Sequence, residues 1–571
     1  MKLFSTVAIR SNLAHPSKAL IDQNLLIGRY WTSSFLSIFV VALTACSGGG
    51  GGSPTNTTPG DTTAPTAIMA PANVASSVDT AVAITANFSE DMFASTIDNI
   101  NFTLSDADGD IEATVSFDAI NNIAELTPSI KLDLLETYTS QLNANITDLS
   151  GNPLAITSTQ FTTRDGTWNG PAYLIDGAGN GDADAPQVVV DHRGGVFAIF
   201  AKFDGVNTSI YVSRYNVDGG WIATDLIETE NEGNAANPQI AVDPNGNAIA
   251  VWDQFDGVRE NIWANRFTNG SWGTAEIIDG LGGSAIEPKI AVNSNGDAIA
   301  VWDQFDGTRN HIFYNRFTNG SWGGYGSIQT SFSGESSKPQ VTIDLNGNAN
   351  VVWFDRSSSN ITSIWANRLT NGSWATAEMI ETAPIDAENL QIAADPKGNV
   401  IAVWDQSDGT RTNIWANRYH FLNGWGTAEL IETNDTGRAI QPQIAMSSTN
   451  NFTVVWVHND GLHDKVGTNR FTPNGWGIAE LIETVNASSN PQIAVDPNGN
   501  AIAVWHQIGG TADDCWFSRY SNNSWSTAEL IETSPGNVDA PQISVGLNGH
   551  ATAVWRQTNG GREAILARHF N

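Results

Sequence analysis

The sequence predicts an all-β protein whose C-terminal part, residues 165–571, is an eight-bladed β-propeller. Three observations lead to this prediction. A segment of about fifty residues recurs eight times, and each copy holds four short runs rich in β-branched and aromatic residues. A lone fourth run, Thr167–Asp176, precedes the first copy, while the last copy ends after its third run at Ala564–Phe570. The lone run can therefore complete the last blade and close the ring without an open edge.

Each copy is marked at the same place by a proline, replaced once by leucine. The markers are Pro186, Pro238, Pro288, Pro339, Leu390, Pro442, Pro491 and Pro541. A constant spacing of this kind is typical of stacked or radial repeats, and four strands per repeat is the content of a propeller blade.

The second run of a copy alternates large and small apolar residues. In the second copy, Ile249 and Val251 point to one side of the strand, and Ala248, Ala250 and Trp252 point to the other. Because both sides of the strand are apolar, we expect both faces of each blade to be covered by neighbouring blades. The apolar period of two excludes an amphipathic helix.

Composition limits the function classes. The 571 residues carry a net charge of -33 and a pI near 4.4, and 41% of them are hydrophobic. An acidic chain without clustered Lys and Arg is not expected to bind nucleic acid. We expect a monomer without a cofactor.

An apolar run, Phe35–Ala45, ends in the four residues Leu43–Cys46 and is followed by a glycine tract. The sequence LTAC resembles the lipobox of bacterial lipoproteins, which implies that residues 1–46 hold a signal peptide and that Cys46 is acylated and anchors the chain to a membrane. Ser47 resembles the residue found in lipoproteins sent to the outer membrane, on its periplasmic or its outer side. Residues 47–63 are then a flexible tether. With Cys46 acylated, Cys515 has no partner for a disulfide.

Residues 64–163 contain alternating runs such as AVAITANFS, NFTLS, AELTP and TQFTT, which predict a small antiparallel sandwich. Together with FSEDM, ITDLSGNPL and FTT they resemble the bacterial Ig-like domains of S-layer and other cell-surface proteins. The resemblance implies a spacer or adhesive module. We interpret Asp106–Asp110 as a polar turn, because Phe117 stands where an EF-hand needs its glutamate.

Every copy carries an arginine on its predicted third strand. These are Arg214, Arg266, Arg316, Arg368, Arg418, Arg470, Arg519 and Arg568. Because a catalytic site needs one asymmetric set of residues, we expect each arginine to make the same structural hydrogen bond to a carboxylate or a backbone carbonyl. The turn Asp243–Gly246 is explained by an aspartate that caps its own backbone.

The hairpin between the second and third strands is the candidate binding site. If Asp256 and Gly257 form a two-residue turn, Gln254 pairs with Arg259 and Trp252 with Asn261. The same set recurs as Trp302, Gln304, Arg309 and His311, and as Trp404, Gln406, Arg411 and Asn413. An indole beside amides and a guanidinium suits a sugar ring. The alternative is that these residues only bridge adjacent blades.

No enzyme signature is found in the sequence. The nine histidines show no metal-ligand spacing, and no Ser, His and Asp triad can be assigned. We therefore expect a non-catalytic platform for glycan or protein ligands, in which near-identical blades offer repeated weak sites. A divergent, sialidase-like enzyme active on glycosides is the alternative. The hairpins and the long connections between blades share one face, which we expect to be the recognition face.

Overall fold

The computed structural model describes residues 61–571, except residues 178, 180, 218, 231–232, 281, 330–333, 384, 434–435, 449, 484–486 and 510–511. The predicted signal peptide, Cys46 and residues 47–60 of the tether lie outside the described residues, so lipidation stays a prediction. None of the helices in the described part is long and apolar enough to cross a membrane.

The N-terminal domain is a sandwich of two four-stranded sheets. One sheet has the order β1 (Ala67–Ala70), β3 (Ile84–Phe88), β6 (Ile123–Pro128) and β5 (Ala113–Asp118). The other has the order β2 (Ala75–Val78), β8 (Thr157–Thr163), β7 (Thr137–Leu142) and β4 (Phe102–Ser105), and a 3-10 turn covers Ala94–Thr96. Phe102, Tyr138 and Phe161 are buried in the core. The expectation of a purely antiparallel sandwich is wrong at one pair, because β2 runs parallel to β8.

Eight further sheets form the blades, numbered here in chain order. Blade 1 comprises β10 (Ala183–Val190), β11 (Val196–Phe203), β12 (Thr208–Asn216), β13 (Gly220–Trp221) and β14 (Asp225–Leu226). Blade 2 comprises β15 (Ala235–Val242), β16 (Ala248–Phe255), β17 (Glu260–Thr268), β18 (Ser271–Trp272) and β19 (Glu276–Ile277). Blade 3 comprises β20 (Ala285–Val292), β21 (Ala298–Phe305), β22 (Asn310–Thr318), β23 (Ser321–Trp322) and β24 (Gly326–Ser327). Blade 4 comprises β25 (Glu335–Ile343), β26 (Ala349–Arg356), β27 (Thr362–Thr370), β28 (Ser373–Trp374) and β29 (Glu378–Met379).

The second half of the ring repeats this plan. Blade 5 comprises β30 (Ala387–Ala394), β31 (Val400–Ser407), β32 (Thr412–His420), β33 (Gly424–Trp425) and β34 (Glu429–Leu430). Blade 6 comprises β35 (Ala439–Met446), β36 (Phe452–Asn459), β37 (Asp464–Thr472), β38 (Gly475–Trp476) and β39 (Glu480–Leu481). Blade 7 comprises β40 (Ser488–Val495), β41 (Ala501–Ile508), β42 (Asp513–Ser521), β43 (Ser524–Trp525) and β44 (Glu529–Leu530). Blade 8 comprises β45 (Val538–Val545), β46 (Ala551–Asn559), β47 (Arg562–Phe570) and β9 (Trp168–Leu174).

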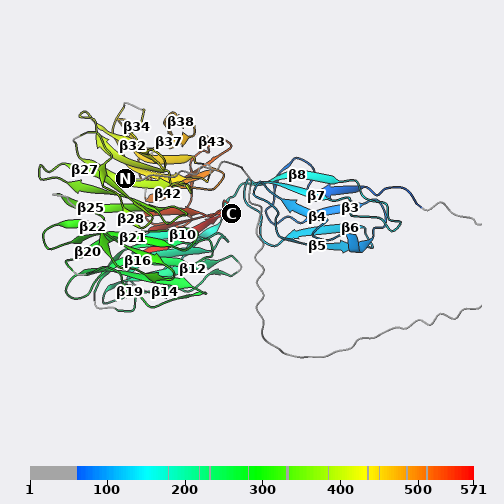
Figure 1. Cartoon of the computed structure of the whole chain (residues 1–571), viewed down its shortest axis with the longest axis horizontal. Helices are drawn as coiled ribbons and strands as arrows, with labels where there is room; N and C mark the ends of the chain where they lie inside the picture. The colour runs from blue at the N-terminus through cyan, green and yellow to red at the C-terminus, as the bar shows by residue number, and fades with distance from the viewer. Residues whose placement is uncertain are drawn as a thin grey trace, which may run out of the picture. The chain divides into compact units, whose positions relative to one another are not determined.

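The ring closes as the sequence predicts. The N-terminal strand β9 pairs antiparallel with the C-terminal strand β47 and supplies the outer strand of blade 8. The first strand of each blade contacts the first strand of the next, and β45 contacts β10 across the closure, where β10 lies beside the C-terminus (Figure 1). The prediction of eight blades is confirmed.

The alternation of large and small residues packs one blade on the next. Ala248, Ala250 and Trp252 of blade 2 lie in one cluster with residues of blade 1. Ile249 and Val251, on the opposite side of the same strand, pack against the alanines and the tryptophan of blade 3. The predicted assignment of the two sides is therefore confirmed. The large side chains on one face of a blade thus fill the space above the small side chains on the facing side of the next blade.

The fourth strand departs from the prediction. The sequence indicates one continuous run from Trp272 to Asp279, whereas the structure has two short pieces, β18 and β19, that both pair with β17. Between them the Gly273 amide donates to the Arg266 carbonyl. The outer edge of blades 1 to 7 is thus short and interrupted, which limits edge-to-edge pairing with other chains, whereas blade 8 has the single strand β9 at this place.

Candidate functional site

The hairpin that carries the predicted site has a different register from the expected one. Gln254 pairs with Asn261 and Phe255 with Glu260, so the loop has four residues rather than two. The Asp256 carboxylate accepts hydrogen bonds from the backbone amides of Val258 and Arg259, at 2.8 and 2.9 Å. This side-chain cap lengthens the loop, which is why the two-residue turn prediction is wrong.

The tryptophans of the predicted site are closed to solvent. Trp252, Trp302 and Trp404 are each 0% exposed. Their Nε1 atoms donate to the side-chain oxygens of Gln254, Gln304 and Gln406, respectively, at 3.0, 3.0 and 3.1 Å. An indole enclosed between blades cannot stack on a sugar, so the stacking role predicted for these residues is wrong. The small-residue side on which they lie is covered by the preceding blade.

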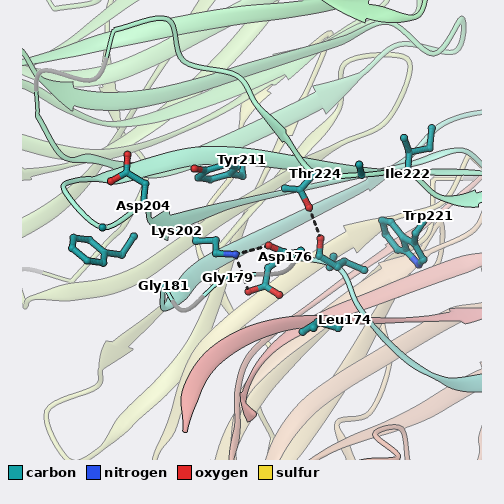
Figure 2. Close-up of a pocket in the computed structure, with 15 residues that line it drawn as sticks. Leu174, Asp176, Gly179, Gly181, Lys202, Asp204, Tyr211, Trp221, Ile222 and Thr224 are labelled. Carbon is teal, nitrogen blue, oxygen red and sulfur yellow. Dashed lines mark hydrogen bonds and ion pairs between the residues drawn. The ribbon is translucent and has the colours of Figure 1, made fainter. Parts of the chain in front are cut away.

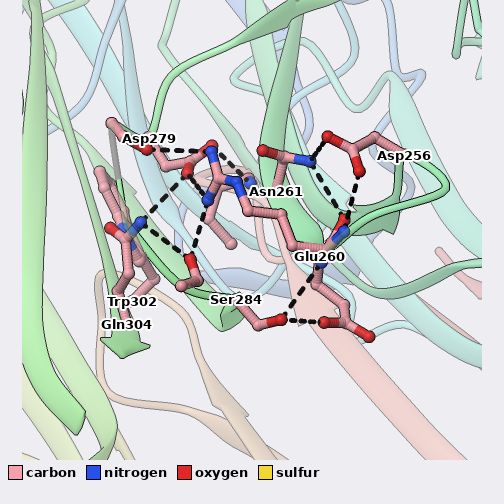
Figure 3. A network of polar contacts seen from close by, with 11 residues as sticks. Asp256, Glu260, Asn261, Asp279, Ser284, Trp302 and Gln304 are labelled. Carbon is pink, nitrogen blue, oxygen red and sulfur yellow. Dashed lines mark hydrogen bonds and ion pairs between the residues drawn. The ribbon is translucent and has the colours of Figure 1, made fainter. Parts of the chain in front are cut away.

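The hairpin arginine of blade 2, Arg259, belongs to an inter-blade network that includes Asp279 and Gln304, both labelled in Figure 3. Arg259 Nη1 lies 2.8 Å from Asp279 Oδ2, and the guanidinium also donates to the carbonyls of Gly280 and Gly283. Gln304 of blade 3 reaches the same carboxylate at 3.3 Å. Burial raises the pKa of Asp279, and Arg259 opposes that rise. We call this set the Arg259 clamp.

The other predicted hairpin residues have similar structural partners. Arg411 lies 3.7 Å from Glu432, and its Nε donates to Asn413. His311 Nε2 lies 3.0 Å from Asp306 Oδ2. The backbone amide of Arg309 donates to the same aspartate, at 3.0 Å. These contacts favour the alternative in which the hairpin residues have a structural role and do not bind a ligand.

The partners of the hairpin arginines form a class that sequence reasoning missed. One polar residue, acidic in seven of the eight blades, lies two residues after the outermost strand of each blade and has a buried side chain. The class comprises Asp176, Glu228, Asp279, Gln329, Glu381, Glu432, Glu483 and Glu532. The recurring "IE" or "ID" after the fourth run was the available signal, because a carboxylate at one fixed place in an apolar segment needs a fixed partner.

Several third-strand arginines have the predicted carboxylate or carbonyl partner, and an aromatic ring is a further partner that was not expected. In six of the eight blades the guanidinium lies over an aromatic ring of the next blade, as Arg266 does over Phe317 at 4.9 Å and Arg470 over Tyr520 at 3.7 Å. A carboxylate is added in some blades, as for Arg368 and Asp344 at 3.0 Å. Such cation–π contacts explain why an aromatic residue follows the arginine in most copies.

The eighth arginine does not align with the other seven. Arg568 pairs with Ala553, which is the register place of Asn265 rather than of Arg266. Its Nη1 donates to the Ile531 carbonyl, just as Asn265 donates to Ile227 in blade 2. His569 takes the arginine position and stacks on Trp221 of blade 1. The joint between blades 8 and 1 therefore differs from the joints inside the ring.

Blade 1 lacks most of the repeated polar set. Phe200 replaces the tryptophan and Lys202 the glutamine, and Asn207 stands near the place of the hairpin arginine. Lys202 Nζ donates to the Asp176 carbonyl at 2.7 Å and lies 3.8 Å from its carboxylate. Glu228, at the end of the same blade, has no arginine in an ion pair among the described residues. Burial raises its pKa to about 7.

A pocket of about 760 Å³ opens at this joint, between the segment after β9 and the hairpin of blade 1 (Figure 2). We call it the seam pocket. Its walls include Tyr211 and Trp221, and Thr224 and Lys202 place polar groups between them. The Thr224 hydroxyl donates to the Ile175 carbonyl at 3.0 Å. The volume lies within the range of small-molecule sites.

A second variable feature lies at the hairpin end of every blade. Three residues on the first, second and third strands lie along a diagonal there: in blade 2, Ala236 pairs with Asp253, and Glu260 lies two residues before Ile262, the partner of Asp253 on the third strand. In blade 7 it reads Ser489, His506 and Asp513, and in blade 8 it reads Asp539, Arg556 and Glu563. We call this the entry row. Its composition changes from blade to blade while the surrounding residues repeat.

Buried members of the entry row have perturbed acidities. Burial raises the pKa of Asp253 to about 6, and burial together with nearby Glu287 raises that of Asp303 to about 8. Asp253 accepts from the Asn237 amide at 2.9 Å and from the Glu287 backbone amide at 3.2 Å. Sequence reasoning missed this row, because only the register brings its three members together.

Comparison with known proteins identifies the N-terminal domain. Residues 61–163 match the family model described as a bacterial Ig-like domain. A comparison with curated proteins gave no match.

Solved structures resemble the chain at low identity. A protein of unknown function from Dyadobacter fermentans is 10% identical, with 70% of this chain and 98% of that chain covered and a TM-score of 0.38. An ulvan lyase is 9% identical, with 63% and 96% covered and a TM-score of 0.40. An intramolecular trans-sialidase from Ruminococcus gnavus is 12% identical, with 68% and 94% covered and a TM-score of 0.33. Likenesses at this level carry no functional argument.

Proposed function

We propose that this chain is a cell-envelope recognition protein that binds a glycan in the seam pocket. The observation that carries the proposal is the pocket itself, a concave site at the joint where Phe200 and Lys202 replace the Trp and the Gln of the repeated set. Aromatic walls with a few fixed polar groups are typical of sugar-binding sites. The many equivalent sites expected from the sequence give way to one site.

Aromatic residues continue away from the pocket on the same face. Phe203, at the rim, is 45% exposed. Phe255 and Phe305 hold the same hairpin position in blades 2 and 3 and are 37% and 40% exposed. Exposed rings on three successive blades offer a stacking surface for further sugar units of a chain. A linear glycan therefore fits this face better than a single free sugar.

The carboxylates of the pocket favour binding over glycosidic cleavage. A glycosidase needs two carboxyl groups available on either side of the bond that breaks. Asp176 is held by Lys202 and by Arg562, whose Nη2 donates to it at 3.1 Å. Asp204 caps its own hairpin by accepting from the amides of Val206 and Asn207. Both groups already have structural roles, so we propose recognition rather than a divergent glycoside-active enzyme.

A glycan array probed with the purified chain tests the proposal. We expect the wild type to bind a defined glycan, and Tyr211→Ala to weaken that binding about tenfold, which equals about 1.4 kcal/mol. Phe313→Ala is the matched control, because Phe313 pairs with Trp302 in blade 3 as Tyr211 pairs with Phe200 in blade 1. If the folded wild type binds no glycan on the array, the glycan proposal is wrong and a protein ligand is the remaining candidate. Equal weakening by both variants would refute the pocket.

For the cellular location we propose an outer-membrane lipoprotein anchored through Cys46, with the bacterial Ig-like domain as a spacer. The support is the sequence LTAC followed by the polar segment 47–63. Cys46→Ser should move the chain from the membrane fraction to the soluble fraction. Retention of Cys46→Ser in the membrane fraction would contradict lipid anchoring. Ser47→Ala, which keeps the cysteine, should leave the chain in the membrane fraction.

A further inference from the structure

Blade 7 is the only blade whose entry row contains a histidine, and its neighbours there are a serine and an aspartate. Ser489 Oγ lies 2.7 Å from His506 Nδ1. His506 Nε2 lies 3.3 Å from Asp513 Oδ2 on the other side of the ring. The three residues come from β40, β41 and β42, and the serine and the histidine are direct cross-strand partners.

This order of groups defines one tautomer of the imidazole. Asp513 lies within ion-pair distance of Nε2, and with the proton on Nε2 the Nδ1 atom is unprotonated and faces the serine hydroxyl. A hydroxyl at hydrogen-bond distance from an unprotonated imidazole nitrogen, with a carboxylate behind the ring, is the arrangement that activates a serine nucleophile. The Asp513 side chain is 38% exposed and that of His506 is 14% exposed, so the row borders solvent at Asp513 while His506 Nε2 itself is buried.

The backbone beside Ser489 offers a place for a negative oxygen. In blades 3 and 6, the residue before the anchor proline has a left-handed backbone, and its amide donates to an aspartate of the preceding blade. Glu287 donates to Asp253 at 3.2 Å, and Gln441 donates to Asp405 at 3.1 Å. In these two blades a carboxylate oxygen therefore accepts the hydrogen bond of that amide.

Blade 7 keeps the amide but loses the carboxylate. Asn490 has the same place and a similar backbone, with φ of 50° against 54° and 56° for Glu287 and Gln441. The residue of blade 6 that corresponds to Asp253 and Asp405 is Val457. The Asn490 amide, next to Ser489, can therefore donate a hydrogen bond to an oxygen that comes from a ligand.

We propose that Ser489, His506 and Asp513 form a nucleophilic site that hydrolyses small acyl esters, with the Asn490 amide as a donor to the oxyanion. Ser489 Oγ attacks the ester carbonyl carbon while His506 Nδ1 takes its proton. His506 then protonates the departing alcohol, which leaves an acyl-serine. Water, deprotonated by His506, attacks the acyl group, releases the carboxylic acid and restores the serine. The overall reaction consumes one ester and one water and yields one acid and one alcohol.

Acyl groups on a glycan are the ester class that fits this site. The row lies at the hairpin end of the blades, as the seam pocket does, and the buried Val457 puts a small apolar side chain where other blades have a charge. An acetyl group suits that side chain better than a long acyl chain. The proposal rests on different residues from those of the seam pocket, so either can fail without the other.

The test uses the purified full chain, a fluorophosphonate probe and 4-nitrophenyl acetate. We expect the probe to add its mass to the peptide that contains Ser489, and the chain to hydrolyse the ester faster than buffer does. Ser489→Ala and His506→Gln should abolish labelling and lower the hydrolysis rate at least about 100-fold. Asp513→Asn should lower it about tenfold.

Ser337→Ala is the matched control. Ser337 holds the place of Ser489 in blade 4, where its cross-strand partner is Phe354 rather than a histidine. It should leave labelling and rate unchanged. No labelling of the folded wild type, labelling of another serine, or a wild-type rate in Ser489→Ala would each overturn the proposal. A purely structural role for the three residues would alter the melting temperature of the variants without any labelling of the wild type.

Discussion

The joint between blades 2 and 3 and the joint between blades 8 and 1 solve the same packing problem in different ways. At the inner joint, Ile249 and Val251 fill the space above the alanines of blade 3, and the Arg259 clamp ties both blades at the rim. At the joint between blades 8 and 1, Lys202 stands at the position of the clamp residue Gln304, and the seam pocket opens beside it. The difference shows that the repeated polar residues hold the ring together. We propose that the positions that break the repeat at this joint are available to a ligand.

The largest expected effect tests the closure that creates this difference. Removal of residues 167–174 takes β9 from blade 8 and exposes the edge of β47. We expect the variant to lose the single cooperative unfolding transition of the ring, measured by circular dichroism and calorimetry. An unchanged single transition at the wild-type temperature would mean that the ring does not depend on its N-terminal strand.

The features that could be predicted from the sequence are local or periodic. Eight copies, the two sides of Ile249 and Ala250, and closure by the lone fourth run follow from spacing and from the period of two. The register of the hairpin was missed because the Asp256 side chain, not the turn dipeptide, sets the loop length. The residue before each anchor proline has a left-handed backbone in every blade, which no propensity predicts for Glu287.

The candidate site was harder to predict, because it depends on which face a neighbour covers. Trp252 and Gln254 were correctly recognised as a repeated set, but their burial follows from the preceding blade and not from their own strand. The seam pocket arises from a replacement, Gln to Lys202, whose effect appears only when blade 8 lies beside blade 1. Strand pairing brings Ser489 to His506, and Asp513, two residues before the partner of His506 on the third strand, reaches it with its side chain.

A second prediction compares a tryptophan of the inner ring with the aromatic residue of the seam. Trp302→Ala should lower the free energy of unfolding by about 3–5 kcal/mol, because it removes a fully buried indole and leaves a cavity. Tyr211→Ala, at the seam, should cost about 1 kcal/mol, because the ring is only partly buried and already borders a pocket. Urea unfolding measures both. Similar losses of unfolding free energy for the two variants would show that the joint at the seam pocket is packed as tightly as the joint between blades 2 and 3.

The third prediction breaks the Arg259 clamp. Arg259→Leu leaves the buried carboxylate of Asp279 without its cation, and we expect a loss of about 2–3 kcal/mol at neutral pH. The double variant Arg259→Leu with Asp279→Asn should regain part of that loss, since no buried charge remains. The control is Arg193→Leu, which changes an exposed arginine and should stay within about 0.5 kcal/mol. A double variant as unstable as Arg259→Leu would show that the clamp acts through packing and not through charge.

The smallest expected effect concerns Glu228, the buried carboxyl group of blade 1 that has no clamp arginine. Burial raises its pKa from 4.5 to about 7, so between these pH values the carboxyl group is protonated in the folded chain and ionised in the unfolded chain. Stability from this group is therefore fully present below pH 4.5 and disappears as the pH rises through about 7. The cost at pH 8 is about 1–3 kcal/mol.

Glu228→Gln removes the ionisation that causes this cost. The variant should match the wild type at pH 4.5 and be more stable at pH 8, as measured by urea unfolding at the two values. Other buried carboxyl groups, such as Asp253 and Asp303, add to the pH dependence of both proteins equally and cancel in the comparison. Glu529→Gln, an exposed residue of β44, should leave the difference between the two pH values unchanged. A Glu228→Gln variant with the full pH dependence of the wild type would show that this carboxyl group is stabilised when charged, and that blade 1 compensates for the missing arginine by other means.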